Sequence, residues 1–178
     1  SYTVGSVRFS NDGSNTTVDV GDVQVIIGEF EVENQSDNNE DFVLATVEFE
    51  INGSGNFDNL ANGAIYYLGE RVSDSITPLD DRLRFSFNDG GFLLEDGDTE
   101  DFEIKADIVT GDDNDTVILQ LDEDNDFTVF VANTAYNYAV DVTRSSPTTG
   151  ILSTYTINAG TVTFARHPSS PSATEITD

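Results

Sequence analysis

The sequence predicts an all-β protein, an antiparallel β-sandwich of the Ig-like or jelly-roll type with about ten strands. Nearly every segment with a clear hydrophobic period repeats at every second residue, which is typical of strands with one face on a core and the other in water. The linkers are rich in Gly, Asn, Asp and Ser and fall at spacings typical of a sandwich. We expect at most one short helical turn, within residues 57–64.

The predicted strands can be followed along the chain. Residues 5–10 and the pair Val18 and Val20 indicate the first two. In residues 23–32 the apolar side chains change phase at Gly28, which predicts a bulge that lets the two halves of this strand serve different sheets. The clearest alternation follows in the segments 45–51, 83–87, 102–108, 117–121 and 127–131.

Size and composition favour one sizeable domain. The chain has 178 residues, of which 37% are hydrophobic, with twelve Phe and six Tyr to fill a core. We assign residues 1–159 to the sandwich and residues 160–178 to a C-terminal strand and polar tail. No run of about 18 apolar residues occurs, so we expect no membrane insertion. No signal-peptide pattern begins at Ser1, so we expect a processed, mature chain.

The charge is strongly negative. Thirty-four acidic residues stand against seven basic ones, for a net charge of −27. Such a surface repels phosphate, so nucleic acid and anionic headgroups are not expected partners. It suits a protein kept soluble in high salt, where charges are screened. The absence of Cys and Met leaves few side chains to oxidise, which favours an extracellular or cell-surface location.

The residues offer little for catalysis, and we expect no enzyme. Without Cys there is no thiolate nucleophile, and the single histidine, His167, lies in the Ser/Pro-rich tail. Paired carboxylates can hydrolyse glycosides, but among so many acids no pair stands out. Trp, which is common in sugar-binding clefts, is absent.

Calcium is the one cofactor that the sequence suggests. Asp122, Asp124 and Asp126 have the spacing of the first half of an EF-hand loop. Phe127 stands where that loop needs Gly, and Asn133 where it needs a bidentate Glu, so an EF-hand is excluded. A Ca²⁺ site in a β-turn and a solvated acidic loop remain as alternatives. A second acidic loop, 112–115, precedes the same strand and is expected at its opposite end.

Several other features admit both a functional and a plain reading. Sequons place potential glycans at Asn15, Asn34, Asn52 and Asn114, in predicted loops or strand ends, although chance alone accounts for their number. Lys105 lies on the polar face of its strand, which disfavours an isopeptide cross-link. The tyrosines 66, 67, 136 and 138 could form a ligand platform or lie half-buried at sandwich ends.

The C-terminal segment repeats a pattern from the start of the chain. Gly-Ser-Val-Arg-Phe-Ser at 5–10 is echoed by Gly-Thr-Val-Thr-Phe-Ala at 160–165. The echo suggests a strand without a sheet of its own, although two strands of one β-domain can also share these residues. We expect Gly160, Val162, Phe164 and Ile176 to make an assembly contact with another copy.

The stretches 90–108 and 115–122 resemble Ig-like sandwich repeats of cell-surface proteins from candidate-phylum bacteria. In such repeats a Gly-Thr-Leu-Thr-Val strand and a Ser-Pro-Ser-Ala turn lead into each new domain. Gly160–Phe164 and Ser170–Ala173 stand in that leading position here, at the end of this chain. The resemblance implies a domain exposed on a cell exterior. The chain is also similar, more vaguely, to camelysin-like fibre subunits, which polymerise by strand donation.

Two functions follow from these observations. The first is a structural subunit of an extracellular filament or surface layer, a homopolymer in which residues 160–178 add a strand to the next subunit. The second is a monomeric adhesin or carbohydrate-binding module that takes glycans, with or without Ca²⁺. A viral capsid or tail sandwich is a third alternative. Removing residues 160–178 separates the first two.

Overall fold

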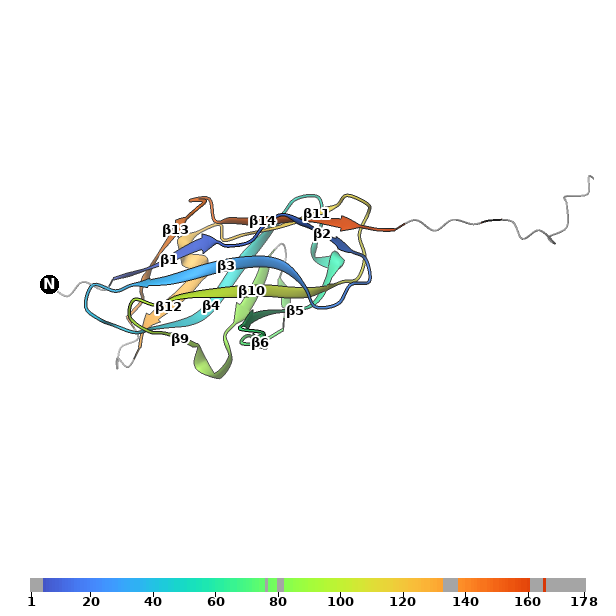
Figure 1. Ribbon diagram of the computed structural model, residues 1–178. Helices are drawn as coiled ribbons and strands as arrows, with labels where there is room; N and C mark the ends of the chain where they lie inside the picture. Colours follow the sequence, from blue (N-terminus) through green and yellow to red (C-terminus); the bar gives the residue numbers. More distant parts are fainter. Residues whose placement is uncertain (1–4, 76, 80–81, 133–137, 161–164, 166–178) are drawn as a thin grey trace, which may run out of the picture.

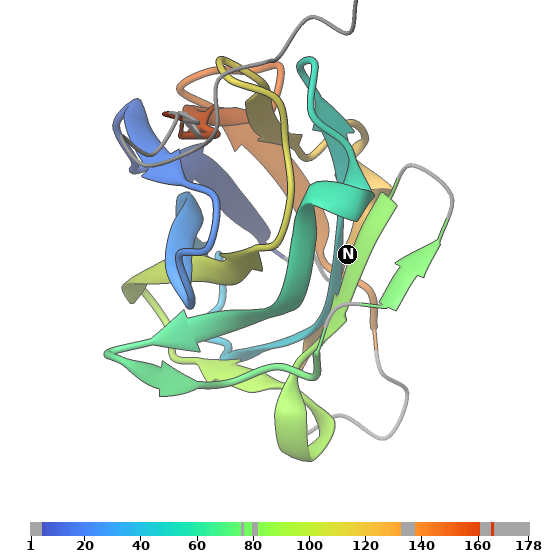
Figure 2. The ribbon, with the colours of Figure 1, turned by 90° about the vertical axis from the view of Figure 1, so that its right-hand side faces the viewer.

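A computed structural model gives the fold of the protein and describes residues 5–75, 77–79, 82–132, 138–160 and 165. Two β-sheets pack face to face, so the predicted all-β sandwich is confirmed (Figures 1 and 2). The first sheet has the order β13-β1-β3-β10-β5-β6, and the second has the order β2-β14-β11-β4-β8-β7. Strands β9 and β12 join the second sheet through β4.

The described residues contain fourteen strands and three short 3-10 turns. The strands are β1 (Ser6–Asn11), β2 (Thr16–Asp19), β3 (Val25–Gln35), β4 (Phe42–Asn52), β5 (Leu60–Tyr67), β6 (Glu70–Arg71), β7 (Thr77–Leu79), β8 (Arg82–Ser86), β9 (Phe92–Leu94), β10 (Thr99–Ile108), β11 (Thr116–Gln120), β12 (Phe127–Val131), β13 (Asp141–Ser145) and β14 (Ile151–Asn158). The turns are η1 (Phe57–Asn59), η2 (Asn88–Gly90) and η3 (Asp124–Asp126), and η1 lies where a helical turn was expected. None of these described segments is a helix long and apolar enough to cross a membrane.

Two details of the predicted fold class need correction. The strand count exceeds ten because β6, β7 and β9 have only two or three residues, too few to show a period. The sheets are mixed rather than antiparallel, because β1 pairs with β13 and β2 pairs with β14 in parallel. These parallel pairs join residues 6–19 to the last strands, so the described start and end of the domain are both fixed to its sheets.

Aromatic rings join the two sheets in the core. Phe9 and Phe30 of the first sheet stack with their ring centroids 5.3 Å apart. Phe49 of the second sheet lies 5.7 Å from Phe30 and 6.2 Å from Phe9. All three side chains are buried, and each contributes both apolar area and ring contacts to the packing.

The bulge predicted at Gly28 is present. Ile104 of β10 lies opposite Gly28 and Lys105 lies opposite Ile26, so Ile27 is the extra residue. A side chain at Gly28 would have its Cβ within 3.1–3.2 Å of Leu152, Ile104 and Leu119. The expected change of sheet does not occur, because β3 pairs with β10 along both halves. A second bulge, between β10 and β5, lets the neighbouring strand bend along with β3.

Candidate assembly site

The chain leaves the sandwich at the end of β14. Asn158 is held there by a side-chain hydrogen bond of 2.6 Å from its Nδ2 to Oδ1 of Asp19, and its carbonyl accepts from the amide of Val20 at 3.0 Å. Gly160 follows with a φ of +65°, is exposed, and has no atom within 4 Å of where a Cβ would stand. Of the expected assembly residues, Gly160 is therefore at the end of the sandwich; Val162, Phe164 and Ile176 lie outside the described residues.

Exposed valines surround this exit. Val20, Val23 and Val109 have 36%, 70% and 53% of their surface exposed. Backbone hydrogen bonds hold their segments together, from the amide of Ile108 to the carbonyl of Asp22 at 2.9 Å and from the amide of Gly21 to the carbonyl of Ile108 at 2.8 Å. We call these three valines the exit patch. Exposed apolar side chains on neighbouring segments of so acidic a surface are suited to a protein contact.

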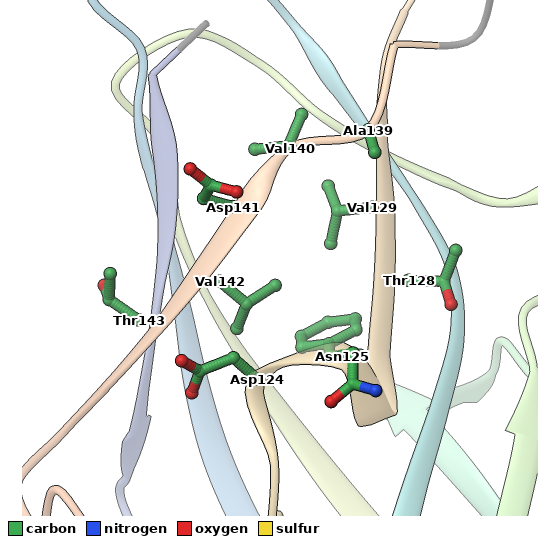
Figure 3. Close-up of a pocket in the computed structure, with 10 residues that line it drawn as sticks. Asp124, Asn125, Thr128, Val129, Ala139, Val140, Asp141, Val142 and Thr143 are labelled. Carbon is green, nitrogen blue, oxygen red and sulfur yellow. The ribbon is translucent and has the colours of Figure 1, made fainter.

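A groove lies between β12 and β13 (Figure 3), two strands that are toward the other end of the molecule (Figure 1). Its volume is about 540 Å³. Figure 3 shows Val129, Val140 and Val142 turned toward one another across it, while Asp124 and Asp141 stand at its side. Phe127 completes the apolar lining. We call this the β12–β13 groove.

The groove exists because the two sheets do not join along this side. β13 pairs with β1 and is an edge strand of the first sheet. β12 pairs with β4 in the second sheet. Among the described residues no ladder joins β12 to β13; the segment before β13 is tied to β12 by hydrogen bonds of 2.9 Å from Val140 N to Val129 O and from Val131 N to Tyr138 O. An unpaired strand edge is a template for another strand.

Arg144 fixes the acidic loop 122–126, which lies at one end of the groove; we call this the near end of the groove. Its Nε donates to Oδ1 of Asp124 at 2.7 Å, and its Nη1 donates to the carbonyl oxygens of Leu121, at 3.1 Å, and of Asp122. β13 is thereby joined to η3 across the ends of the two sheets. The carboxylate of Asp141, at the groove's side, is exposed and has no hydrogen bond or ion pair among the described residues.

The proposed calcium ligands do not converge. Asp124 is held by Arg144, whereas Oδ2 of Asp126 accepts from Nη1 of Arg82 at 3.2 Å and from the amide of Glu123 at 3.0 Å. The described part of the chain contains no group of three or more acidic, His or Cys side chains placed to hold a metal. Ca²⁺ binding through Asp122, Asp124 and Asp126 stays a prediction, and the ion would compete with the guanidinium groups of Arg144 and Arg82. As expected, the loop 112–115 lies at the other end of β11.

The four sequons differ in access. Asn34 is 3% exposed, and its Nδ2 donates to the carbonyl oxygens of Glu40, Leu94 and Glu95. The Asn34 prediction is therefore wrong for the folded chain, because the nitrogen that would carry a glycan is buried and bonded. Asn52 donates to Gln120 Oε1 at 2.7 Å. Asn15 and Asn114 are exposed, and glycans there stay predictions.

Lys105 and Tyr66 form ordinary surface contacts, whereas Tyr67 packs against the core. The ammonium of Lys105 lies 2.7 Å from a carboxylate oxygen of Glu103 and 5.1 Å from the ring centre of Tyr66. Tyr67 packs on Phe92 and Phe102, and its hydrogen bond to Glu100 raises the pKa of its hydroxyl. Tyr66 and Tyr67 thus point to different surroundings; Tyr136 lies outside the described residues, as does His167.

The sequence pattern did not reveal the groove. Phe127, Val129, Val140 and Val142 alternate in the way expected of core-facing strand residues, and all four are buried. Periodicity reports which face of a strand is apolar, but it carries no information about whether the strand's edge is paired. That information comes from the pairing of β13 with β1, whose residues are more than 130 positions away.

The sequence matches no protein-family model, and none of the curated proteins is similar to it. Among solved structures, the chain is similar to the seventh type I cohesin of ScaB from Pseudobacteroides cellulosolvens, with 14% identity, 91% of this chain and 98% of that chain covered, and a TM-score of 0.42. The cohesin module of a family 33 glycoside hydrolase from Clostridium perfringens is 13% identical, with 89% of this chain and 100% of that chain covered and a TM-score of 0.41. A type III cohesin module of the scaffoldin ScaE from Ruminococcus flavefaciens is 6% identical, with 89% of each chain covered and a TM-score of 0.34. Likenesses this weak carry no argument about what the chain does, and its fold class rests on its own strands.

Proposed function

We propose that this protein is a structural subunit of an extracellular filament or surface layer, assembled head to tail as residues 160–178 add a strand to the next subunit. The observation that carries the proposal is the placement of the two ends. The chain leaves the sandwich after β14, while the open edge of β13 lies toward the opposite end (Figure 1). A donor at one end and an open edge at the other make a contact that does not close on itself, and such contacts propagate into a fibre.

The echo between residues 5–10 and 160–165 supports the donor role. In the first copy, Val7 and Phe9 of β1 are 0% and 1% exposed, so this pattern is one that builds the sandwich core. Gly5 is required there, because a Cβ would lie 2.2 Å from the carbonyl oxygen of Gln35. The second copy has the same alternation, Val162 and Phe164, and under this proposal it enters a sheet of the next subunit.

Surface chemistry supports an extracellular setting. The net charge of −27 opposes close stacking at low salt and is screened in brine or in a cation-rich envelope. The exit patch would be covered by the neighbour in a head-to-tail contact. Both features suit a protein that is soluble as a subunit and associates end to end.

The test is removal of residues 160–178. We expect the full chain to form elongated particles by electron microscopy and light scattering at high concentration and high salt, and the truncated chain to stay monomeric. Circular dichroism with an unchanged β signal and thermal transition shows that the truncated sandwich is intact. A matched variant, Phe164→Asp in the full chain, should also stay monomeric. A full-length chain that is strictly monomeric under these conditions would overturn the proposal; a monomeric adhesin would bind its glycan with or without the tail.

A further inference from the structure

We propose that the β12–β13 groove is the acceptor for this contact, and that its occupant is residues 161–167 of a second copy of the chain. The inference rests on the proposed function and adds to it the receiving surface. The exposed edge of β6, at the far side of the first sheet, is a competing acceptor.

The dimensions of the groove fit one short strand. β13 has five residues and therefore spans about 17 Å, which is the length of five donor residues, 161–165, in extended conformation. A strand placed beside the open edge of β13 would continue the first sheet past β13 and close the side where the two sheets part. It would face β12 across the groove.

The side chains of the donor match the groove in character. Alternation puts Val162 and Phe164 on one face of a strand and Thr161 and Thr163 on the other. The apolar face would meet the lining formed by Phe127, Val129, Val140 and Val142. The polar face would meet water.

Charge favours the same pairing. Arg166 is one of only seven basic residues in the chain and directly follows the apolar donor residues. Asp141 is exposed at the side of the groove and has no ion pair among the described residues. A guanidinium brought to this carboxylate would form a rim ion pair, which in solvent is worth about fivefold in affinity at most.

The donor cannot fill the groove of its own subunit. The near end of the groove adjoins the start of β14, because Arg144 bonds Asp124 and Leu121, and the amide of Leu121 donates to the carbonyl of Gly150 at 3.0 Å. From there the eight residues of β14 lead away over about 25 Å. The six residues that follow Asn158, up to Phe164, span at most about 21 Å when fully extended. Val162 and Phe164 therefore fall short of Val142, and the occupant must be a second copy.

Disulfide trapping tests this placement, since the chain contains no cysteine of its own. Thr163→Cys is made in one copy, and Asp141→Cys or Thr143→Cys in the other; both β13 positions are exposed and two residues apart on one face. Equimolar mixtures are oxidised under assembling conditions and resolved on non-reducing gels. We expect a mixed dimer with at least one of the two β13 variants, and none with Glu70→Cys on the edge strand β6.

Each outcome bears on one proposal or the other. A cross-link to Glu70→Cys in place of β13, or polymers that form without any β13 cross-link, would overturn the groove while strand donation stands. If the unmodified full chain forms no polymers under these conditions, the proposed function itself would be overturned. As a second measurement, Asp141→Asn should raise the concentration needed for assembly by up to about fivefold, whereas Glu70→Gln should leave it unchanged. An equal response of the two charge variants would remove the Arg166 contact from the proposal.

Discussion

The hydroxyl of Tyr155 in β14 donates a hydrogen bond of 3.3 Å to Oε2 of Glu29 in β3, which joins the two sheets. The Tyr155 ring is 1% exposed. Burial, followed by the negative charge of Glu29, raises the pKa of the Tyr155 hydroxyl above its usual range. The phenol therefore stays neutral in the folded state at pH values where it ionises in the unfolded chain.

Removing this hydroxyl should weaken the sandwich. Tyr155→Phe keeps the ring and loses a hydrogen bond to a charged acceptor, which is worth about 1.5 kcal/mol. Urea denaturation at pH 7 measures the change in the free energy of unfolding. Tyr66→Phe is the matched control, because its hydroxyl, bonded to Gln24 Oε1, lies at the exposed surface. Equal losses in the two variants would contradict the role assigned to the buried bond.

The same hydroxyl predicts a loss of stability in alkali. A group whose pKa is raised on folding keeps the folded state favoured below its unfolded pKa, near 10, and that contribution is lost as the pH rises above it. We expect the free energy of unfolding to fall above pH 10 in the natural chain and to fall less steeply in Tyr155→Phe. Parallel slopes for the two proteins would exclude Tyr155 as the titrating group.

Carboxylates face one another across β3 and β10. Asp101 lies directly opposite Glu31, and Glu103 lies opposite Glu29. Burial, then the charges of Asp12, Glu31 and Glu100, raise the pKa of Asp101. A raised carboxyl pKa favours the folded state at low pH, and that contribution is lost as the pH rises through the folded pKa.

Asp101→Asn should therefore stabilise the protein at pH 7. The repulsion is at the surface and partly screened, so we expect a gain of about 0.3 kcal/mol that shrinks as the pH falls below 4. Denaturation at both pH values measures it. Glu70→Gln removes an equal charge from the exposed strand β6 and should change little. A loss of stability in Asp101→Asn at pH 7 would show that Asp101 makes a favourable contact instead.

The two glycines of the echo should respond differently to alanine. At Gly5 a Cβ would lie 2.2 Å from the backbone oxygen of Gln35 and 2.6 Å from Cα of Ser36, so Gly5→Ala should cost about 3 kcal/mol. Gly160→Ala meets no atom and is strained only by its φ of +65°, so it should lower the free energy of unfolding by about 1 kcal/mol. Thermal denaturation of the two variants side by side tests this. A tolerant Gly5 would mean that β1 can shift away from β3.

Arg144 should matter beyond its charge. Its guanidinium bonds Asp124 and two backbone carbonyls at once, and a lysine ammonium cannot reach all three. Arg144→Lys should lose about 1.5 kcal/mol of stability, measured by urea denaturation. Arg84→Lys, on an exposed position of β8, is the matched control. If the two substitutions cost the same, the η3 loop is held by other contacts.

How much the sequence could predict depends on strand length and on pairing. Alternation predicted the buried residues of long strands, such as Phe102, Ile104 and Ala106 of β10, because one face of a strand repeats every two residues. The bulge at Gly28 was visible because the apolar phase changes there. The bulge of β4 at Ala45 was missed, since the shift in register lies opposite Thr128 and Val129, far along the chain.

Pairing between distant strands leaves no trace in a single sequence. The parallel ladder of β1 with β13 joins Val7 to Val142, and neither segment indicates its partner or its direction. The burial of Asn34 was missed for the same reason: its three acceptors lie on the segments 40 and 94–95. The candidate groove follows from such pairings, so it could be recognised only in the folded chain.

Ionic strength provides the last test, because the acidic surface opposes the association that the tail favours. With −27 per subunit, repulsion between neighbours should keep polymer mass low in dilute buffer. The screening length falls from about 10 Å at 0.1 M salt to about 3 Å at 1 M, so we expect polymer mass, measured by light scattering, to rise over that range. Acid should act in the same direction by neutralising carboxylates.

Divalent ions then separate screening from a specific site. At matched ionic strength we expect Ca²⁺ and Mg²⁺ to promote assembly equally, because Arg144 and Arg82 already hold Asp124 and Asp126. A response to Ca²⁺ alone, abolished by Asp122→Asn, would instead assign an ion to the 122–126 loop beside the groove. Polymer mass that is insensitive to salt, acid and divalent ions would contradict the view that charge repulsion limits assembly.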